Sequence, residues 1–329
     1  MRLRTVALFV TLAFGILSGP LAAEAQPPGK VPRIGFLCPI SKPGGPYLLA
    51  LRKGLRELGY VEGQSITIEA RFAEERLERF SGLVAELVQL RVDVLVPMGP
   101  SALRAARQAT STIPIVMAGA ADPIGTGFVA SLARPGGNIT GLTSLASELA
   151  GKRLELLKEV LPGLRRVAIF WHPTEPEEAA EWREADRAAR ALGLQLQSLE
   201  VRASDDLTKA FLSLTKERVD ALVNVGWFAP ASTRAESIIA FAVANRLPTM
   251  FSRTKFVEDG GFMSFSANYE ELYRRTATYV DKLLKGARPG DLPVEQPTRF
   301  ELVINMKTAK ALGLTIPQSV LIRADRVIQ

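Results

Sequence analysis

The stretch Arg33–Leu37, which reads RIGFL, is answered later in the chain by Arg166–Phe170, which reads RVAIF. Three further landmarks recur in the same order and at nearly the same spacing. They are Leu58-Gly59 with Leu192-Gly193, Arg91–Val96 with Arg218–Val223, and Ile113-Pro114 with Leu247-Pro248. Any alternation of strands and helices gives some self-similarity, but a fixed order at a near-constant spacing favours a duplication. We therefore expect two similar α/β lobes, with a cleft between them where a small ligand binds.

Short apolar runs alternate with helical periodicities along almost the whole chain. Arg33–Leu37 is typical of a buried parallel strand, and Tyr47–Leu58 has the leucine spacing of a helix that ends at Gly59. This alternation predicts an α/β fold with two doubly wound parallel sheets. The carboxyl ends of parallel strands meet at one edge, so the ligand site is expected in the loops beyond that edge.

The composition fits a globular chain of two ordinary domains. The 329 residues are 47% apolar, which is enough to form real cores, and nothing indicates disorder. The formal charge of +7 is spread along helical stretches without a basic stripe, so we expect no nucleic-acid partner. Cys38 is the only cysteine, which excludes an internal disulfide; we interpret it as a packed strand-end residue rather than a thiol in the cleft.

The N-terminus has the three parts of a secretory signal peptide. Two arginines within the first four residues precede the apolar run Val6–Leu17, and Ala23–Ala25 has the small–x–small pattern of a cleavage site. We predict a signal peptide over residues 1–25, followed by a Pro/Gly linker over residues 26–32. The apolar run is short for an uncleaved membrane anchor, which is the alternative. Because Cys38 lies too far along to carry a lipid, we expect a free periplasmic protein.

Motifs for enzymatic chemistry are missing from the sequence. The loop after Leu37 lacks the G-x-G-x-x-G pattern of a dinucleotide site, and neither a Walker A motif nor a G-x-S-x-G elbow occurs. His172 is the only histidine, and one histidine with one cysteine cannot form a zinc site. We therefore expect no cofactor, no metal and no catalysis. Asp122 with His172 is the one acid–base pair that an enzyme alternative could use.

The strand-end loops supply the candidate ligand-binding residues. In the first lobe these are Ser41, Gly99, Ser101, Ala121 and Asp122, with Thr143 near the exit from the lobe; in the second they are Trp171, His172, Asn224, Trp227, Phe251 and Ser252. Ser101 opens a predicted helix, whose free N–H groups favour a carboxylate. The aromatic residues suit stacking on a flat group, although packing at the sheet rim explains them equally well. Asp122 is a candidate acceptor for an ammonium group; because it precedes a proline, a turn or cap role is an equal alternative.

Several motifs resemble those of the ABC-transporter substrate-binding proteins, of the type that includes a tryptophan-binding component. Besides Arg33–Leu37, they are Leu51–Tyr60, Ala121–Val129, Leu132–Gly141 and Asn305–Pro317. The resemblance covers essentially the whole mature chain. The loops around Trp171 and Trp227 depart from those of the members compared, which leaves the ligand open.

The resemblance implies a type I periplasmic-binding-protein fold, in which three segments cross between the lobes. We place the crossings near Thr143, Ala267 and Pro297. The first lobe would then comprise residues 33–143 and 267–296, and the second residues 144–266 and 297–329. In this arrangement the predicted helix Tyr269–Leu284 returns to the first lobe and the C-terminal tail joins the second.

Together, the signal, the lobes and the missing catalytic motifs favour the extracytoplasmic solute-binding component of an ABC importer. It would close on a small organic solute, an aromatic or other amino acid, and present it to a membrane permease with its ATPase subunits. We expect a monomer. The alternatives are a secreted two-lobed α/β enzyme and a ligand-sensing receptor subunit of a membrane signalling system. A sugar-repressor-like regulator shares the fold, but the signal and the missing helix-turn-helix argue against it.

Overall fold

The computed structural model describes residues 30–40, 45–74, 76–202, 204–226 and 231–329, and Pro32–Gln329 forms one compact unit. The predicted signal peptide lies outside the described residues, as do the candidate ligand residues Ser41 and Trp227. Within the described ranges, no helix combines the length and the apolar character needed to cross a membrane.

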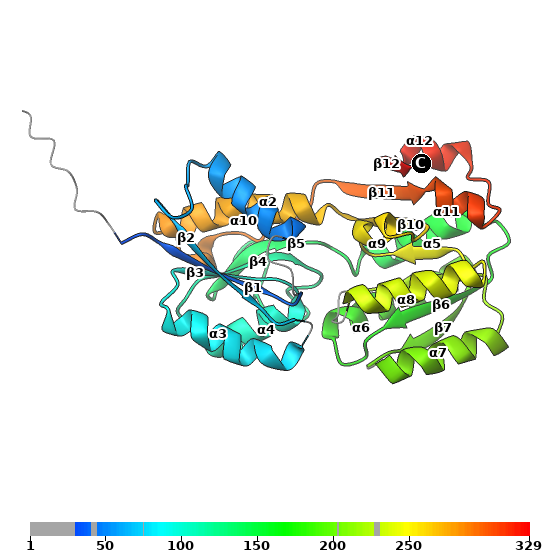
Figure 1. Cartoon of the computed structure of the whole chain (residues 1–329), viewed down its shortest axis with the longest axis horizontal. Coiled ribbons are helices and arrows are strands. Elements are labelled where there is room, and N and C mark those ends of the chain that lie inside the picture. The colour runs from blue at the N-terminus through cyan, green and yellow to red at the C-terminus, as the bar shows by residue number, and fades with distance from the viewer. Residues whose placement is uncertain (1–29, 41–44, 75, 203, 227–230) are drawn as a thin grey trace, which may run out of the picture. The chain divides into compact units, whose positions relative to one another are not determined.

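The first lobe is built on a parallel sheet of five strands in the order β2-β1-β3-β4-β5. The strands are β1 (Arg33–Cys38), β2 (Thr67–Phe72), β3 (Val94–Pro97), β4 (Ile115–Ala120) and β5 (Ile139–Thr143). The helices are α2 (Pro46–Glu57), α3 (Phe80–Gln89, after the 3-10 turn Leu77–Arg79), α4 (Pro100–Ala109) and the distant α10 (Tyr269–Leu284). Figure 1 shows α2 beside α10, with α3 and α4 across the sheet from them.

Strand periodicity divides the first lobe's core into two layers. Ile34 and Phe36 of β1 pack with α2 and α10, whereas Leu37 packs with α3 and α4. Cys38 is buried in the first of these layers, where its thiol lies 3.5 Å from the Met98 sulfur. Burial raises the pKa of the Cys38 thiol to about 11, so it behaves as a packed residue.

The second lobe repeats this arrangement and extends it. Its sheet has the order β12-β11-β10-β9-β8-β6-β7. The strands are β6 (Arg166–Trp171), β7 (Gln195–Glu200), β8 (Ala221–Asn224), β9 (Thr249–Phe251), β10 (Met263–Ala267), β11 (Phe300–Asn305) and β12 (Arg326–Ile328). The helices are α5 (Leu149–Val160), α6 (Pro176–Leu192), α7 (Ser204–Lys216), α8 (Ala231–Ala244), α9 (Thr254–Glu258), α11 (Met306–Ala311) and α12 (Gln318–Arg323). β11 runs antiparallel to β10, and the other pairings are parallel.

The duplication predicted from the sequence is confirmed by the strand order. In the first lobe β1 pairs with β2 and β3, and β4 and β5 follow; in the second, β6 pairs with β7 and β8, and β9 and β10 follow. The landmark segments Arg33–Leu37 and Arg166–Phe170 thus occupy the same place in the two sheets. The α/β fold of two parallel-sheet lobes is confirmed, with the antiparallel β11 as an addition to the second.

Three local features differ from the sequence-based expectation. The loop expected after Phe251 contains the short helix α9, and the C-terminal tail forms α12 and β12. These elements are too short to show a clear periodicity. Helix α4 begins at Pro100 with Gly99 as its cap residue, at φ 85°. Ser101 therefore lies inside the first turn and does not cap the helix.

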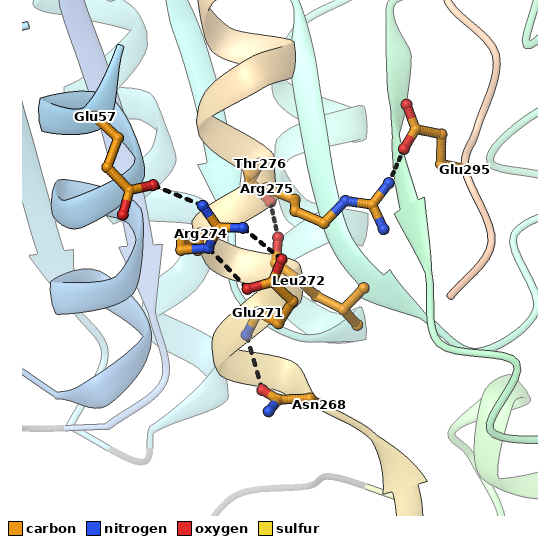
Figure 2. Close-up of polar contacts among 8 residues, drawn as sticks. All are labelled: Glu57, Asn268, Glu271, Leu272, Arg274, Arg275, Thr276 and Glu295. Atoms are coloured by element: carbon orange, nitrogen blue, oxygen red, sulfur yellow. Dashed lines mark hydrogen bonds and ion pairs between the residues drawn. The ribbon is translucent and has the colours of Figure 1, made fainter. Parts of the chain in front are cut away.

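Helix α10 is far from the first lobe in sequence and is attached to it by polar contacts. The Asn268 side chain caps the helix, because it accepts a hydrogen bond from the Glu271 N–H at 2.8 Å. One turn later, Arg274 pairs with Glu271 at 2.7 Å and with Glu57 of α2 at 2.6 Å (Figure 2). These contacts connect α10 to α2.

A close approach of the two helices supports the same attachment. A Cβ atom at Gly54 of α2 would lie 2.1 Å from the Arg274 carbonyl oxygen, so the packing of α2 on α10 requires a glycine there. Arg275 pairs with Glu295, on the segment that pairs with β5 (Figure 2). The exact lobe boundaries and the three crossings stay predictions.

Candidate ligand-binding cleft

A small cavity lies at the carboxyl ends of β3 and β4, where the parallel sheet was expected to bind its ligand. Its lining comes from the ends of these strands, from Tyr269 and Tyr273 of α10, and from two charged residues of the second lobe, Glu177 and Arg253. The free volume is about 20 Å³. A single water molecule needs roughly this space, so the cavity is far too small for an amino acid.

Helix α6 brings an unusual set of glutamates to this cavity. Glu175 immediately precedes the helix. Three further glutamates within its first two turns are buried as well: Glu177, Glu178 and Glu181. Carboxylates are stabilised at a helix N-terminus by the unpaired N–H groups and the helix dipole. The helix N-terminus cannot stabilise all four carboxylates, and each has different surroundings.

Glu177 lines the cavity and is 7% exposed. Burial raises the pKa of its carboxyl to about 7, while the backbone N–H of Ala121 and the charge of Arg253 act in the opposite direction. Within the described part of the chain, its Oε1 atom has no hydrogen-bond partner. Glu177 therefore lines the cavity with a buried carboxyl group whose Oε1 acceptor is unsatisfied.

Glu181 lies one turn further along α6 and forms a buried ion pair. Its carboxylate lies 3.0 Å from Nη1 of Arg153, and both side chains are almost fully buried. Arg153 also donates to the carbonyl oxygens of Phe265 at 2.9 Å and Ala146 at 3.1 Å. Burial lowers the pKa of Arg153 and raises the pKa of Glu181, and the attraction between them opposes both shifts. Arg153 and Glu181 therefore neutralise each other's buried charge.

Glu178 points toward the strand ends of the second sheet. It accepts a hydrogen bond from the backbone N–H of His172 at 2.7 Å. At Gly226 the backbone has φ 76°, and a Cβ atom there would lie 2.1 Å from the Glu178 carboxyl carbon. A glycine at this position lets the chain pass close to the buried carboxylate.

Glu175 connects the lobes. Its carboxylate accepts a hydrogen bond from Ser101 at 3.2 Å and pairs with Arg104 at 2.5 Å, both on α4 of the first lobe. We call Ser101, Arg104 and Glu175 the latch. A second contact is made by Arg253, whose guanidinium lies 3.6 Å from the centre of the Tyr269 ring.

Three tyrosines surround the α10 side of the cleft. Tyr47 lies 4.9 Å from Tyr273 and 6.5 Å from Tyr269, measured between ring centres. Burial raises the pKa of Tyr47 to about 12, so its hydroxyl stays neutral. The arrangement offers aromatic surface and hydroxyl groups beside two charged side chains.

Some of the predicted ligand residues of the first lobe lie at this cavity. Gly99 lines it, Ser101 belongs to the latch, and the backbone N–H of Ala121 acts to lower the pKa of Glu177. Asp122 instead accepts a hydrogen bond from the Gly125 N–H at 2.8 Å, in the local turn that was its alternative role. Thr143 is fully buried and donates to the Ala120 carbonyl at 2.7 Å.

Most of the second lobe's predicted ligand residues pack within the lobe. Trp171 stacks on Trp182 at 5.7 Å and donates to Ser198, and Phe251 is fully buried in the core. The Asn224 side chain is buried, and Ser252 donates to the Gly226 carbonyl. The His172 ring lies by Thr174. Ser41 and Trp227 belong to the segments that the structure does not describe.

The cavity residues that the sequence reasoning missed are Glu177, Arg253, Tyr269 and Tyr273. A signal for Glu177 is present in the sequence: with Glu181, Ala185 and Ala189 it forms one stripe at a spacing of four. Alanines at this spacing mark the packed face of a helix, so the glutamates on the same stripe face inward too. Across the described ranges, no cluster of three or more potential ligands could hold a metal ion.

Two duplicated α/β lobes, with a cavity lined by tyrosines of the first and charged side chains of the second, define a solute-binding protein of two lobes. The model of the ABC transporter substrate binding protein family matches residues 34–328, and the chain belongs to that family. Members of this family bind solutes outside the cytoplasm for membrane ABC transporters and are not enzymes.

Comparison with individual proteins agrees with this assignment. The chain is 26% identical over 266 residues to a tyrosine-binding protein of Clostridioides difficile, covering 80% of this chain and 75% of the relative. A conserved domain protein of Vibrio cholerae superimposes with a TM-score of 0.83 at 28% identity, covering 91% of this chain and all of the other. A domain from Streptococcus pneumonia, solved in complex with L-Trp, gives 0.82 at 28% identity, covering 90% and 99%.

Proposed function

We propose that the protein binds a small organic solute, an aromatic or other amino acid, between its lobes and delivers it to the permease of an ABC importer. The observation that carries the proposal is the cavity itself, whose lining combines strand ends of one lobe with Glu177 and Arg253 of the other. Charges of both signs and buried tyrosines suit a zwitterion with an aromatic or apolar side chain. The tyrosine and tryptophan named for two relatives support this choice.

Binding then requires the lobes to separate. A free volume of about 20 Å³ cannot admit an amino acid, so the solute enters an open form and the lobes close on it. We place the hinge in the three segments near Thr143, Ala267 and Pro297. The moving bodies are residues 33–143 with 267–296, and residues 144–266 with 297–329.

The proposal includes the protein's location and partners. Cleavage after Ala25 would release a monomeric periplasmic protein without a lipid anchor. It would dock on a permease that carries its own ATPase subunits. N-terminal sequencing of the exported protein tests this step, because an intact N-terminus on the exported protein contradicts it.

Solute binding is tested on residues 26–329 by calorimetry and thermal shift against the protein amino acids, related amines and small organic acids. A solute at a hundredfold excess over its Kd stabilises the folded protein by about 2.7 kcal/mol, which raises Tm by several degrees. Stabilisation by one or a few amino acids is the expected result. No stabilisation across the whole panel refutes the proposal.

A further inference from the structure

The carboxylate oxygen Oε1 of Glu177 indicates which kind of solute the cleft prefers. This side chain is more than nine-tenths buried, lines the cavity and has an oxygen, Oε1, that accepts no hydrogen bond from any described residue. A buried acceptor without a donor is costly, by roughly 1–3 kcal/mol for a neutral group and more for a charged one. Such a group is usually completed by a ligand or water when it lies at a binding cavity.

We propose that the cleft takes solutes with a cationic N–H group, and that Glu177 Oε1 accepts a hydrogen bond from that group. The inference rests on the proposed function and deepens it. It names a positively charged nitrogen as the feature that every good ligand shares, whether the ligand is a free amino acid, the N-terminus of a short peptide or a simple amine.

The surroundings favour the ionised form of Glu177 once a cation is bound. The backbone N–H of Ala121 lowers the pKa of this carboxyl, and Glu177 lies in the first turn of α6, where the helix dipole favours a negative charge. Burial acts against ionisation and raises the pKa of the carboxyl to about 7. A bound ammonium group lowers this pKa again, so binding near neutral pH that starts from the closed, solute-free form releases part of a proton.

The other charges at the cleft are used differently. Glu181 forms an ion pair with Arg153, and Glu175 forms one with Arg104. A solute cation would have to compete with these arginines, so Glu177 is the better acceptor. Arg253 lines the same cavity against the Tyr269 ring and provides the position for an anionic group. A solute with both charges fits the cavity best, and one with only the cation fits better than one with only the anion.

The test uses two sets of three compounds, each with a common side chain. The first is L-tyrosine, tyramine and 3-(4-hydroxyphenyl)propionate; the second is L-leucine, isopentylamine and 4-methylpentanoate. Within each set one compound is a zwitterion, one lacks the carboxylate and one lacks the ammonium group. Calorimetry on the mature protein, together with the broader panel, gives a Kd for each compound.

The expected result is that loss of the ammonium group weakens binding more than loss of the carboxylate. Glu177→Gln should weaken binding of ammonium compounds about 10- to 100-fold, because a charge-assisted hydrogen bond is replaced by a neutral one. The matched control is Glu184→Gln, on the same helix two turns further along, where the side chain is 38% exposed and pairs with Arg187. This control should bind like the parent protein. Repeating the titration in buffers of different ionisation enthalpy should show proton release that disappears in Glu177→Gln.

Three outcomes overturn the inference. Tight binding of an ammonium-free solute, unchanged in Glu177→Gln, refutes it while leaving the proposed function intact. Proton uptake on binding refutes it too, because a protonated Glu177 would then donate to the solute. Absence of binding by any compound of the broad panel refutes the proposed function and the inference with it.

Discussion

Because the latch joins the two lobes, we predict that Arg104 affects solute affinity although it does not line the cavity. Arg104→Met removes the charge that faces Glu175 across the lobes and keeps most of the side chain's bulk. The contact can exist only while the lobes are together. Its loss therefore destabilises the closed form and leaves the open form unchanged, so apparent affinity falls although no solute contact is lost.

The expected magnitude follows from burial. Glu175 is 7% exposed, but the Arg104 side chain is 34% exposed, so the pair is worth less than a fully buried one. We estimate about 1 kcal/mol in the closed form, which corresponds to a roughly fivefold rise in Kd. Ser101 still donates to Glu175 in the variant, which limits the loss.

A double-mutant cycle on solute affinity measures this term. Arg104→Met, Glu175→Gln and the double variant are titrated with the best solute of the panel, and Arg190→Met serves as control, because Arg190 pairs with Asp186 within α6. The coupling energy should be about 1 kcal/mol. The loss of affinity should appear as a faster dissociation rate of the solute. A coupling energy of zero, or an equal loss in the control, shows that the latch does not hold the closed form.

Three further predictions concern the buried charges around the cleft. Gly226→Ala should lower stability to urea far more than Gly193→Ala, because both positions have positive φ but only at Gly226 would a Cβ atom collide, 2.1 Å from the carboxyl carbon of a neighbouring glutamate; equal losses contradict this. Arg153→Met alone should cost about 3–5 kcal/mol of unfolding free energy by leaving Glu181 unpaired, whereas Arg153→Met with Glu181→Leu should recover most of it; an unrecovered loss in the double variant contradicts the pairing. Burial raises the pKa of Glu177 from 4.5 to about 7, so the folded protein binds a proton there that the unfolded chain releases. The contribution of Glu177 to stability is therefore fully present below about pH 4.5. It is lost as the pH rises through about 7, by up to about 3 kcal/mol. Urea titrations at about pH 5 and about pH 8 should show a smaller loss in Glu177→Gln than in the parent protein, and identical losses contradict this assignment.

The fold could be predicted because its determinants are local and repeated. The apolar runs at Arg33–Leu37 and Arg166–Phe170 each begin a lobe, and their residues alternate between two core layers as a strand's period of two requires. The same rule explains why Trp171 is not exposed to the cleft. It continues the face of Val167 and Ile169, so it enters the core with them.

The site could be predicted only in part, because burial of a charged residue depends on what its helix packs against. Gly99 and Ala121 lie within two residues of the ends of β3 and β4, so the sheet edge locates them. Glu177 begins a strongly polar helix, and a glutamate in a first turn is usually solvated. Arg253 and Tyr269 follow β9 and β10 of the second sheet, and only the folded chain brings them beside the strand ends of the first lobe.

In the proposed mechanism, the start of α6 links lobe closure to solute recognition. Glu175, which contacts α4 across the lobes, and Glu177, which lines the cavity, are two residues apart at the start of α6. In the proposed binding mode, a solute that binds Glu177 holds the start of α6 in the position where Glu175 contacts Arg104, and the latch in turn holds Glu177 at the cavity. Because each contact orders the segment that the other uses, the energetic effects of Glu177→Gln and Arg104→Met on affinity should be less than additive.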